Sequence, residues 1–258
     1  MNSVKRKITQ LLDKIKVGNR IINDSVFIET EAKSQEEIYK KTRRTDIINF
    51  LLSLTSSDEY LEVGVRDPRK NFDRINCNKK YSVDPGKEFK ENPVDYKMTS
   101  DLFFEKLGKG ELNISSEIKF DAIFIDGLHI SNQAEKDIIN SLKYIKNDGF
   151  IILHDCNPPS EYHQRENYEF MNSPAGPFWN GTTWKAFYKY RHKSELYSIC
   201  FDSDWGVGVL AKKYHPMFNN ITSEIENEYY EFSRLAENRN VFMNLKSFDE
   251  WKESLKTL

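Results

Sequence analysis

Four ionisable residues, in two closely spaced pairs, have the types and spacing needed for chemistry. Asp126 is followed three positions later by His129, and His154 is directly followed by Asp155. Histidine exchanges a proton near neutral pH, and a nearby carboxylate can orient its ring and stabilise its charged form. Two carboxylates brought together can also hold a cation. The residue types therefore indicate general acid–base chemistry, with or without a metal.

The elements around these pairs predict that they meet in space. Each pair follows a short apolar run, at residues 120–125 and 150–153, and the stretch Ser131–Lys146 between the runs has helical periodicity, with Gly149 as its expected stop. A strand, a helix and a strand in this order predict a parallel βαβ unit. Because ligands of open parallel sheets bind beyond the carboxyl ends of the strands, both pairs are expected at one site.

A second set of residues has the spacing of a nucleoside site. Glu62 and Gly64 end an apolar run at Tyr60–Val65, and Asp84 ends the next run 22 positions after Glu62. A glycine after a strand lets the backbone approach a ligand, and an acid at the end of the second strand accepts hydrogen bonds from ribose hydroxyls. An ordinary tight turn at Gly64 and a turn acid before Pro85 are the alternatives. No G-x-G-x-x-G motif is present.

Composition excludes several classes of protein. The chain has 258 residues, a formal charge of −2, an isoelectric point near 6.3 and a mean hydropathy of −0.68. This charge argues against a general nucleic-acid binder, and no apolar run is long enough to span a membrane. Residues 1–7 are charged but lack the apolar stretch of a secretory signal. Three cysteines without CxxC spacing favour free thiols and a cytoplasmic protein.

Three parts are expected along the chain. Residues 1–54 are predicted to form helices, the first ending at Gly18 and the second covering about 34–54, with its basic run 40–44 on a solvated face or, alternatively, contacting phosphate. Residues 55–213 form the core. Within it, the irregular segment 157–182 lies beside the strand ends and is typical of a substrate loop. Residues 214–258 are predicted to form terminal helices at about 220–240 and 246–257.

The pattern predicts the α/β class: a Rossmann-like, mostly parallel sheet of seven strands, with helices on both faces, an antiparallel C-terminal hairpin and extra terminal helices. The expected strands are 60–65, 80–83, a weak one at 96–98, 120–125, 150–153, and the hairpin 196–201 with 206–210. Further helices are expected after Asp67-Pro68, carrying Phe72 and Ile75, after Thr99 or Ser100, and at 183–192.

The order of elements and several motifs resemble the class I S-adenosylmethionine-dependent methyltransferases. The motifs are Leu61-Glu62-Val63-Gly64, Val83-Asp84, Thr99-Ser100-Asp101 and Phe124-Ile125-Asp126-Gly127. Residues 124–129, 153–155 and 179–184 resemble more closely a bacterial subfamily associated with cell-surface polysaccharides. The resemblance covers about residues 45–212 and implies a methyltransferase that binds S-adenosylmethionine through Glu62, Gly64, Val65, Asp84, Ser100, Asp101 and Asp126. The chain departs from the family at Val65-Arg66-Asp67, where further glycines are usual.

The resemblance also implies roles at the reaction centre. His129 stands where catechol-type O-methyltransferases have a lysine base, so it is the expected base, a structural histidine being the alternative. Acids at the positions of Asp126 and Asp155 hold Mg²⁺ in those enzymes, with His154 as a further ligand or second base. A metal-free site, in which the two acids orient the histidines, remains open.

The expected acceptor is a hydroxyl of a sugar, as a nucleotide-linked hexose or heptose for capsule or lipopolysaccharide. The candidates for stacking on the sugar are Phe178, Trp179, Trp184 and Tyr188, with Trp179 and Trp184 foremost, and those for polar contacts are His163 and Arg165. A buried helix face for Trp184 and surface roles for the other two are the alternatives. The terminal helices offer a homodimer face at Tyr229, Tyr230, Phe232 and Leu235, or pack onto the core. A dehydrogenase and a non-catalytic scaffold are the rival functions.

Overall fold

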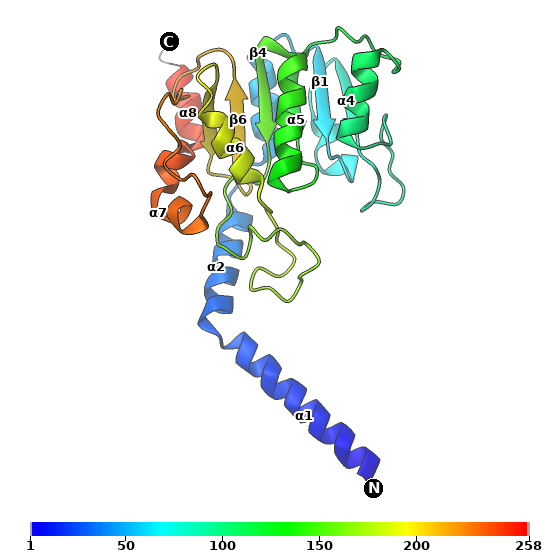
Figure 1. Cartoon of the computed structure of the whole chain (residues 1–258), viewed down its shortest axis with the longest axis vertical. Helices are drawn as coiled ribbons and strands as arrows, with labels where there is room; N and C mark the ends of the chain where they lie inside the picture. The colour runs from blue at the N-terminus through cyan, green and yellow to red at the C-terminus, as the bar shows by residue number, and fades with distance from the viewer. Residues whose placement is uncertain (1, 257–258) are drawn as a thin grey trace.

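A seven-stranded sheet forms the centre of the computed structural model, which describes residues 2–256 (Figure 1). The strands are β1 Glu59–Val63, β2 Lys79–Val83, β3 Phe120–Ile125, β4 Ile145–Leu153, β5 Tyr197–Phe201, β6 Val207–Ala211 and β7 Leu245–Lys246. Their order is β2-β1-β3-β4-β6-β5-β7. β6 runs antiparallel to β4 and β5, and the other pairs are parallel. This is the predicted Rossmann-like sheet with its antiparallel hairpin.

Helices cover both faces of the sheet. They are α1 Asn2–Ile22, α2 Ser25–Tyr39, α3 Arg44–Ser53, α4 Ser100–Lys109, α5 Ser131–Tyr144, α6 Thr183–Arg191, α7 Phe232–Phe242 and α8 Phe248–Leu255. Short 3₁₀ turns lie at Pro68–Lys70 and Phe72–Arg74. Among the described helices, α4, α5, α6 and α7 contribute to the core on one face, and α3 and α8 to the core on the other.

Alternation along the strands produces these two cores. Leu61 and Val63 of β1 belong to one cluster, whereas Tyr60 belongs to the other. Successive side chains of a strand point to opposite faces, so a strand covered by helices on both sides is apolar throughout. All six residues of β3 are buried, and Asp121 is its one exception to this rule. Glu62 is the exception in β1, since it is a buried acid on the face of Tyr60.

Several predicted elements are confirmed: the hairpin β5–β6, helix α6, and helix α4 with Thr99 as its N-cap. The third predicted strand is wrong, because Tyr96 makes only an isolated bridge to Val83. The count of seven strands is nevertheless correct, since β7 adds an edge strand beside β5.

Three predicted helices near glycine or proline residues differ from the structure in where they end or in their type. α1 continues through Gly18, because one glycine costs a helix only about 1 kcal/mol. α5 ends at Tyr144, and Gly149 lies inside β4, where a Cβ would come within 2.8 Å of the Asp121 carbonyl oxygen. The predicted helix after Asp67 is reduced to the two 3₁₀ turns, the first of which begins with Pro68 as expected.

The terminal regions also differ. The predicted helix over 34–54 is broken at residues 40–43, which lie in an extended connection between α2 and α3. The predicted helix over 220–240 shrinks to α7. Leu235 is fully buried and Tyr230 and Phe232 pack against the same core, so much of the suggested dimer face is used within the chain; Tyr229 is exposed.

Candidate active site

A cavity of about 520 Å³ lies beyond the carboxyl ends of β1, β2, β3 and β4. Its wall combines the two groups of residues that the sequence singled out. We call the part formed by Glu62, Gly64, Val65, Asp84, Ser100 and Asp101 the nucleoside half, and the part formed by Arg44, Asp126, His129, His154 and Asp155 the carboxylate–histidine half. The expected convergence of strand ends is therefore observed.

Gly64 shapes the nucleoside half through close packing of two strands. It has a φ of +84°, and a Cβ there would lie 2.3 Å from the carbonyl oxygen of Asp126. Only glycine fits here, because the residues after β3 pass so close to position 64. The missing side chain also leaves this side of the cavity open. Val65, next to it, is buried and lines the same wall.

Asp84 is held by backbone amides at the end of β2. Its Oδ2 accepts a hydrogen bond from the Arg66 amide at 2.8 Å, and its Oδ1 accepts one from the Gly86 amide at 2.6 Å. An ionised carboxylate has about four acceptor sites, so these bonds orient the group without exhausting it. Asp84 can therefore accept hydrogen bonds from a pair of hydroxyls in the cavity, as the sequence predicted.

Glu62 is buried and uncharged at neutral pH. The Tyr60 hydroxyl and the Asn71 amide both donate to its Oε2, at 2.7 and 2.9 Å. Burial raises the pKa of the Glu62 carboxyl to about 8, despite the opposing effect of these hydrogen bonds. Glu62 is thus a neutral acid at the cavity wall in the free protein, and a cation bound nearby would favour its ionisation.

The far end of the nucleoside half is polar. Gln133 of α5 donates from Nε2 to Ser100 Oγ at 3.2 Å and to Asp101 Oδ1 at 3.0 Å. The same amide reaches Asp137, and burial raises the pKa of the Asp137 carboxyl to about 6. Ser100 and Asp101 both line the cavity, where the sequence placed them.

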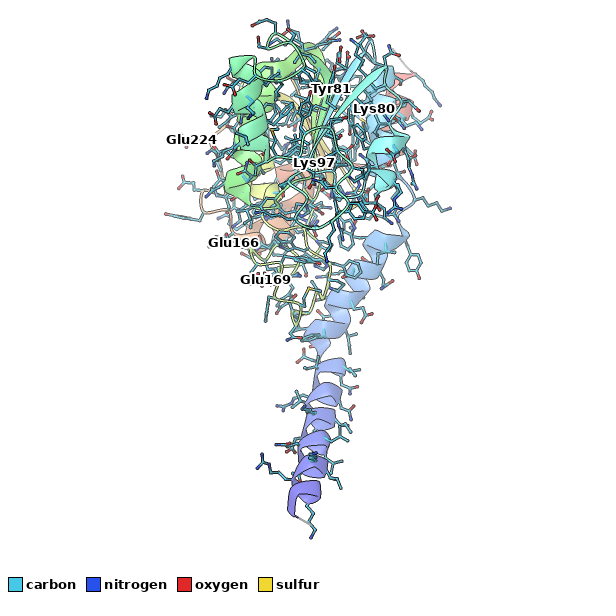
Figure 2. The ribbon with its side chains drawn as sticks, turned by 90° about the vertical axis from the view of Figure 1, so that its right-hand side faces the viewer. Lys80, Tyr81, Lys97, Glu166, Glu169 and Glu224 are labelled. Atoms are coloured by element: carbon cyan, nitrogen blue, oxygen red, sulfur yellow. The ribbon has the colours of Figure 1, made fainter. Side chains whose placement is uncertain are left out.

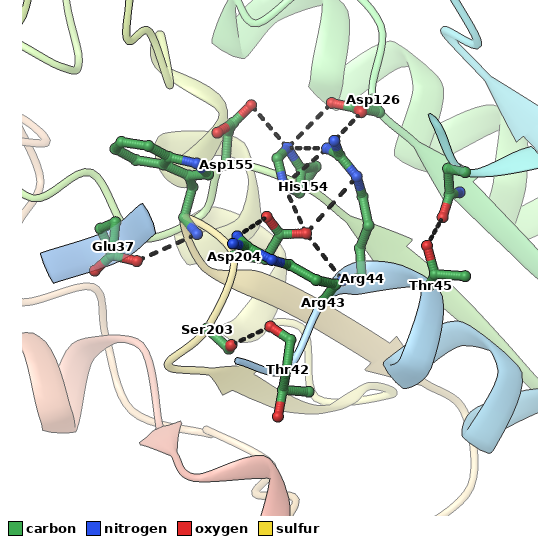
Figure 3. A network of polar contacts seen from close by, with 12 residues as sticks. Glu37, Thr42, Arg43, Arg44, Thr45, Asp126, His154, Asp155, Ser203 and Asp204 are labelled. Carbon is green, nitrogen blue, oxygen red and sulfur yellow. Dashed lines mark hydrogen bonds and ion pairs between the residues drawn. The ribbon is translucent and has the colours of Figure 1, made fainter. Parts of the chain in front are cut away.

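The carboxylate–histidine half is closely connected (Figure 3). His154 Nδ1 lies 3.0 Å from Asp155 Oδ2 and 3.2 Å from Asp126 Oδ1. His129 bridges the same two acids, with Nε2 3.3 Å from Asp126 Oδ1 and Nδ1 3.2 Å from Asp155 Oδ2. The four residues of the predicted centre are therefore in mutual contact.

Arg44, the first residue of α3, reaches into this cluster. Its Nη1 donates to Asp126 Oδ2 at 2.9 Å and lies 2.9–3.0 Å from both ring nitrogens of His154. The prediction that the basic run 40–44 is a solvated face is wrong for this residue, whose side chain is one quarter exposed. The break between α2 and α3 is what directs Arg44 to the strand ends.

The turn of the β5–β6 hairpin fixes Arg44 from the other side. Asp204 Oδ2 accepts from the Arg44 backbone amide at 2.9 Å and lies 3.7 Å from its Nε. Asp204, Trp205 and Gly206 all have positive φ, as does Asp155. Left-handed backbone at non-glycine residues is costly and collects at functional sites, so this turn is held by its contacts.

The charges of this half support one another. Burial alone would raise the pKa of the Asp126 carboxyl, but His154 and Arg44 hold that pKa well below its usual range. Burial and Arg44 oppose a charge on His154, yet Asp155 and Asp126 raise its pKa well above the ordinary value. The pKa of His129 is also raised, because the same two acids outweigh its burial. The cluster thus keeps Asp126 ionised and strengthens both histidines as proton acceptors.

His129 and Trp179 form the outer wall of this half. Their rings stack with centroids 4.9 Å apart, and His129 Nδ1 lies 3.3 Å from the Trp179 carbonyl oxygen. Gly181 has a φ of +60°, and a Cβ there would clash with the His129 carbonyl. Asn180 donates to Asp155 Oδ1 at 2.9 Å. The segment 179–181 therefore closes directly over the histidine and the acid.

Three predicted substrate residues do not reach the cavity. Trp184 is fully buried in the core. His163 is also fully buried, with its nitrogens bonded to the Ser34 and Ser160 hydroxyls, and burial lowers its pKa to about 4. Arg165 donates to the Tyr162, Phe178 and Gly176 carbonyls and so holds the loop together. These three therefore lie outside the cavity wall, and Tyr188 is likewise buried in the core, whereas Phe178 and Trp179 line the cavity.

Other residues of the wall were not singled out as site residues from the sequence. Tyr168 and Trp205 line the cavity together with Trp179 and Phe178, and the Phe178 and Trp205 rings stack at 5.3 Å. The consecutive Asp204-Trp205-Gly206 in a hairpin turn was a usable signal, since tight turns with such residues often lie at sites. Nothing local distinguished Arg44 from its four basic or polar neighbours.

Comparison with known proteins identifies part of the chain. Residues 73–156 match the model of a family described as a methyltransferase domain. The matched segment contains β2, β3 and β4, and thus Asp84, Asp126 and Asp155, in agreement with the predicted enzyme class. Comparison of the sequence with curated proteins gives no significant match.

Solved structures of O-methyltransferases show a distant likeness to this chain. The Bacillus cereus O-methyltransferase in complex with SAH has a TM-score of 0.40 and 13% identity, covering 78% of this chain and 97% of that one. TomG of Streptomyces achromogenes, in complex with SAM, has a TM-score of 0.43 and 10% identity, covering 77% of this chain and 95% of that one. SAH-bound PaMTH1 of Podospora anserina has a TM-score of 0.42 and 14% identity, covering 80% of this chain and 96% of that one. Values this low carry no inference about ligand or substrate.

The residues of the predicted Mg²⁺ site do not fit this ion. Asp126, His154 and Asp155 offer donor atoms within 4.8 Å of one another, a spacing that a metal can use. Mg²⁺ prefers oxygen ligands in an octahedral arrangement, however, and one of these three is an imidazole. The Arg44 guanidinium already bonds to two of them and would repel a second cation. Arg44 supplies the positive charge here.

Proposed function

We propose that this protein transfers a methyl group from S-adenosylmethionine to a hydroxyl group. The observation that carries the proposal is the single cavity in which the nucleoside half and the carboxylate–histidine half face each other, in a chain whose residues 73–156 match a methyltransferase-domain model. A nucleoside donor and an acceptor that needs a base are the two ligands such a cavity suits. A dehydrogenase is disfavoured because the chain lacks its G-x-G-x-x-G motif.

The nucleoside half is suited to hold the donor. Asp84 would accept the two ribose hydroxyls, and Ser100 and Asp101 would border the adenine. The backbone of Gly64 and Val65 would face the methionine portion, where the family's further glycines are missing. Bound S-adenosylmethionine supplies an electrophilic methyl group on a sulfonium, and its positive charge would favour ionisation of the buried Glu62.

His129 is the proposed base. Its Nδ1 faces two acceptor oxygens, of Asp155 and Trp179, so a proton on Nδ1 leaves Nε2 able to accept another. As the acceptor oxygen forms its bond to the methyl carbon and the carbon–sulfur bond breaks, the hydroxyl proton passes to Nε2. Asp126 and Asp155 stabilise the imidazolium that results, as carboxylates do in other histidine-based sites.

Arg44 and His154 are proposed to position rather than to exchange protons with substrate. His154 is buried between Asp126, Asp155 and Arg44, so it fixes the two acids that orient His129. Arg44 keeps Asp126 ionised and ties α3 to the strand ends. A guanidinium holds its charge at all relevant pH values and binds a carboxylate in a fixed direction. The proposed reaction therefore proceeds without a divalent metal.

The proposed acceptor is a sugar hydroxyl. Trp179, Tyr168, Phe178 and Trp205 make an aromatic wall next to His129, and aromatic faces pack against the C–H faces of pyranose rings. A nucleotide-linked hexose or heptose used for capsule or lipopolysaccharide, and a cytoplasmic location, remain predictions from the sequence resemblance. A homodimer also remains a prediction.

Two measurements test the proposal in sequence. Calorimetric titration of the protein with S-adenosylhomocysteine is expected to show micromolar binding, and absence of binding would remove the methyltransferase proposal. Transfer of a labelled methyl group is then followed across free sugars, nucleotide-linked sugars and a catechol. Methylation of a sugar supports the full proposal, whereas methylation of the catechol alone would retain the enzyme class and overturn the acceptor.

A further inference from the structure

Helix α1 lies apart from the body of the protein. Figure 1 shows it projecting away from the sheet, joined to α2 by a short turn, with the N-terminal end far from the C-terminus. Its side chains surround it without neighbours from the sheet or its covering helices in Figure 2. Residues 5–22 are exposed apart from the half-buried Gly18. The described part of the chain therefore offers α1 no surface to pack against.

One face of α1 is apolar. Ile8, Leu11, Leu12, Ile15 and Ile22 recur at the spacing of one helix face. Their exposed fractions lie between 49% and 70%, although such side chains are usually buried. A stripe of this kind on a helix of 21 residues is an interaction surface.

Basic residues flank this stripe on both sides. Placed at 100° per residue, Lys5 and Lys16 border one edge of the stripe, Lys7 and Lys14 border the other, and Arg20 lies farther round the helix. With Arg6, residues 5–22 hold six basic residues against one acid, Asp13, a net charge of +5 in a chain whose total is −2. The partner of this face must therefore be apolar and negatively charged.

We infer that α1 binds the surface of an anionic lipid bilayer. An amphipathic helix with lysines at both edges of an apolar stripe lies in the membrane interface, with its apolar face among the acyl chains and its cations at the headgroups. A second copy of α1 is a poorer partner, because pairing would bring together two helices of the same strong charge. No described helix is long and apolar enough to cross a membrane, so α1 lies on the surface. This inference is independent of the proposed methyl transfer.

Vesicle cosedimentation of the full chain tests the inference. Binding is expected to vesicles of phosphatidylcholine with 40% phosphatidylglycerol, at least about tenfold stronger than to pure phosphatidylcholine and weakened by 0.5 M salt. The triple variant Ile8→Ser, Leu11→Ser, Ile15→Ser keeps every charge and is expected to lose binding. Val17→Ser is the matched control, since Val17 is 47% exposed but lies opposite the stripe.

Three outcomes would overturn the inference. They are no binding to the anionic vesicles by protein that retains its thermal unfolding transition, equal binding to both kinds of vesicle, and undiminished binding by the triple variant. Light scattering after size-exclusion chromatography measures the oligomeric state and so tests whether a second copy of the chain covers the stripe instead. A dimer that the triple variant converts to a monomer, without lipid binding, would assign the stripe to a second copy of the chain.

Discussion

The two halves of the cavity are built in different ways. The hydrogen bonds of the nucleoside half span short to moderate distances along the chain: the Gly86 and Arg66 amides on Asp84 lie 2 and 18 residues away, and Gln133 lies 33 residues from Ser100. The carboxylate–histidine half is joined by ion pairs between segments far apart, such as Arg44 with Asp126 and with Asp204. The difference teaches that the proposed nucleoside site rests mainly on consecutive strand–turn segments, whereas the proposed reaction centre depends on the assembled fold.

The largest expected effect is from Arg44→Met. Removing the guanidinium takes from Asp126 its arginine partner and from Asp204 one of two arginines, so methyl transfer is expected to fall by more than about 100-fold. Affinity for S-adenosylhomocysteine, measured by calorimetry, is expected to stay within about threefold, because the nucleoside half makes few contacts with Arg44.

Arg43→Met is the matched control for this change. Arg43 also pairs with Asp204, at 3.4 Å, but its side chain is 44% exposed and does not line the cavity. A small effect is expected from an exposed pair. If both variants lose activity equally, the loss comes from the shared contact with Asp204 in the hairpin turn. The special role that we propose for Arg44 at Asp126 would then be wrong.

His129→Gln is expected to have the next largest effect, about a 100-fold loss in turnover, because a general base contributes this order of acceleration. Binding of S-adenosylhomocysteine and the unfolding temperature are the controls. A loss of less than about tenfold in turnover, with both controls unchanged, would show that His129 is not the base.

Asp84→Asn probes the nucleoside half by itself. The amide keeps the size of the side chain but loses one charged acceptor, and affinity for S-adenosylhomocysteine is expected to drop about tenfold. Turnover at saturating donor is expected to change little. A drop in saturated turnover with no change in affinity would show that the two halves are not separable in the way proposed.

Glu62→Gln is expected to affect stability in a pH-dependent way. The folded carboxyl, with its pKa raised to about 8 from 4.5, favours the folded state below pH 4.5 and loses this advantage as pH rises toward 8. Native stability relative to the variant should fall by roughly 1.4 kcal/mol per pH unit between these values. Thermal unfolding at pH 5 and pH 8 measures it; a constant difference would contradict a buried neutral Glu62.

Dialysis against a chelator is expected to have the smallest effect. Because Arg44 occupies the position beside Asp126 and His154, turnover should change by less than about twofold after EDTA treatment and not recover further with Mg²⁺. A loss of activity that Mg²⁺ restores would show that Arg44 gives way to a metal.

The sequence by itself determined the sheet, the strand ends and the residues placed on them. Alternation and apolar runs fix which side chains leave a parallel strand, so Asp84, Asp126, His154 and Asp155 were predictable as neighbours of a cavity. The same local reasoning could not separate Trp179, at the cavity, from Trp184, in the core, because no period runs through the irregular segment 157–182 that leads up to them.

Only the tertiary structure decided what completes the reaction centre. Arg44 lies 82 residues before Asp126 and 110 before His154. Asp204, in the turn of the β5–β6 hairpin, follows Arg44 by 160 residues. Charges separated this far in sequence meet only when helices and hairpin have folded against the sheet, and no local pattern encodes that meeting. The same reason explains α1, whose apolar stripe was visible in the sequence, while its lack of any surface to pack against was not.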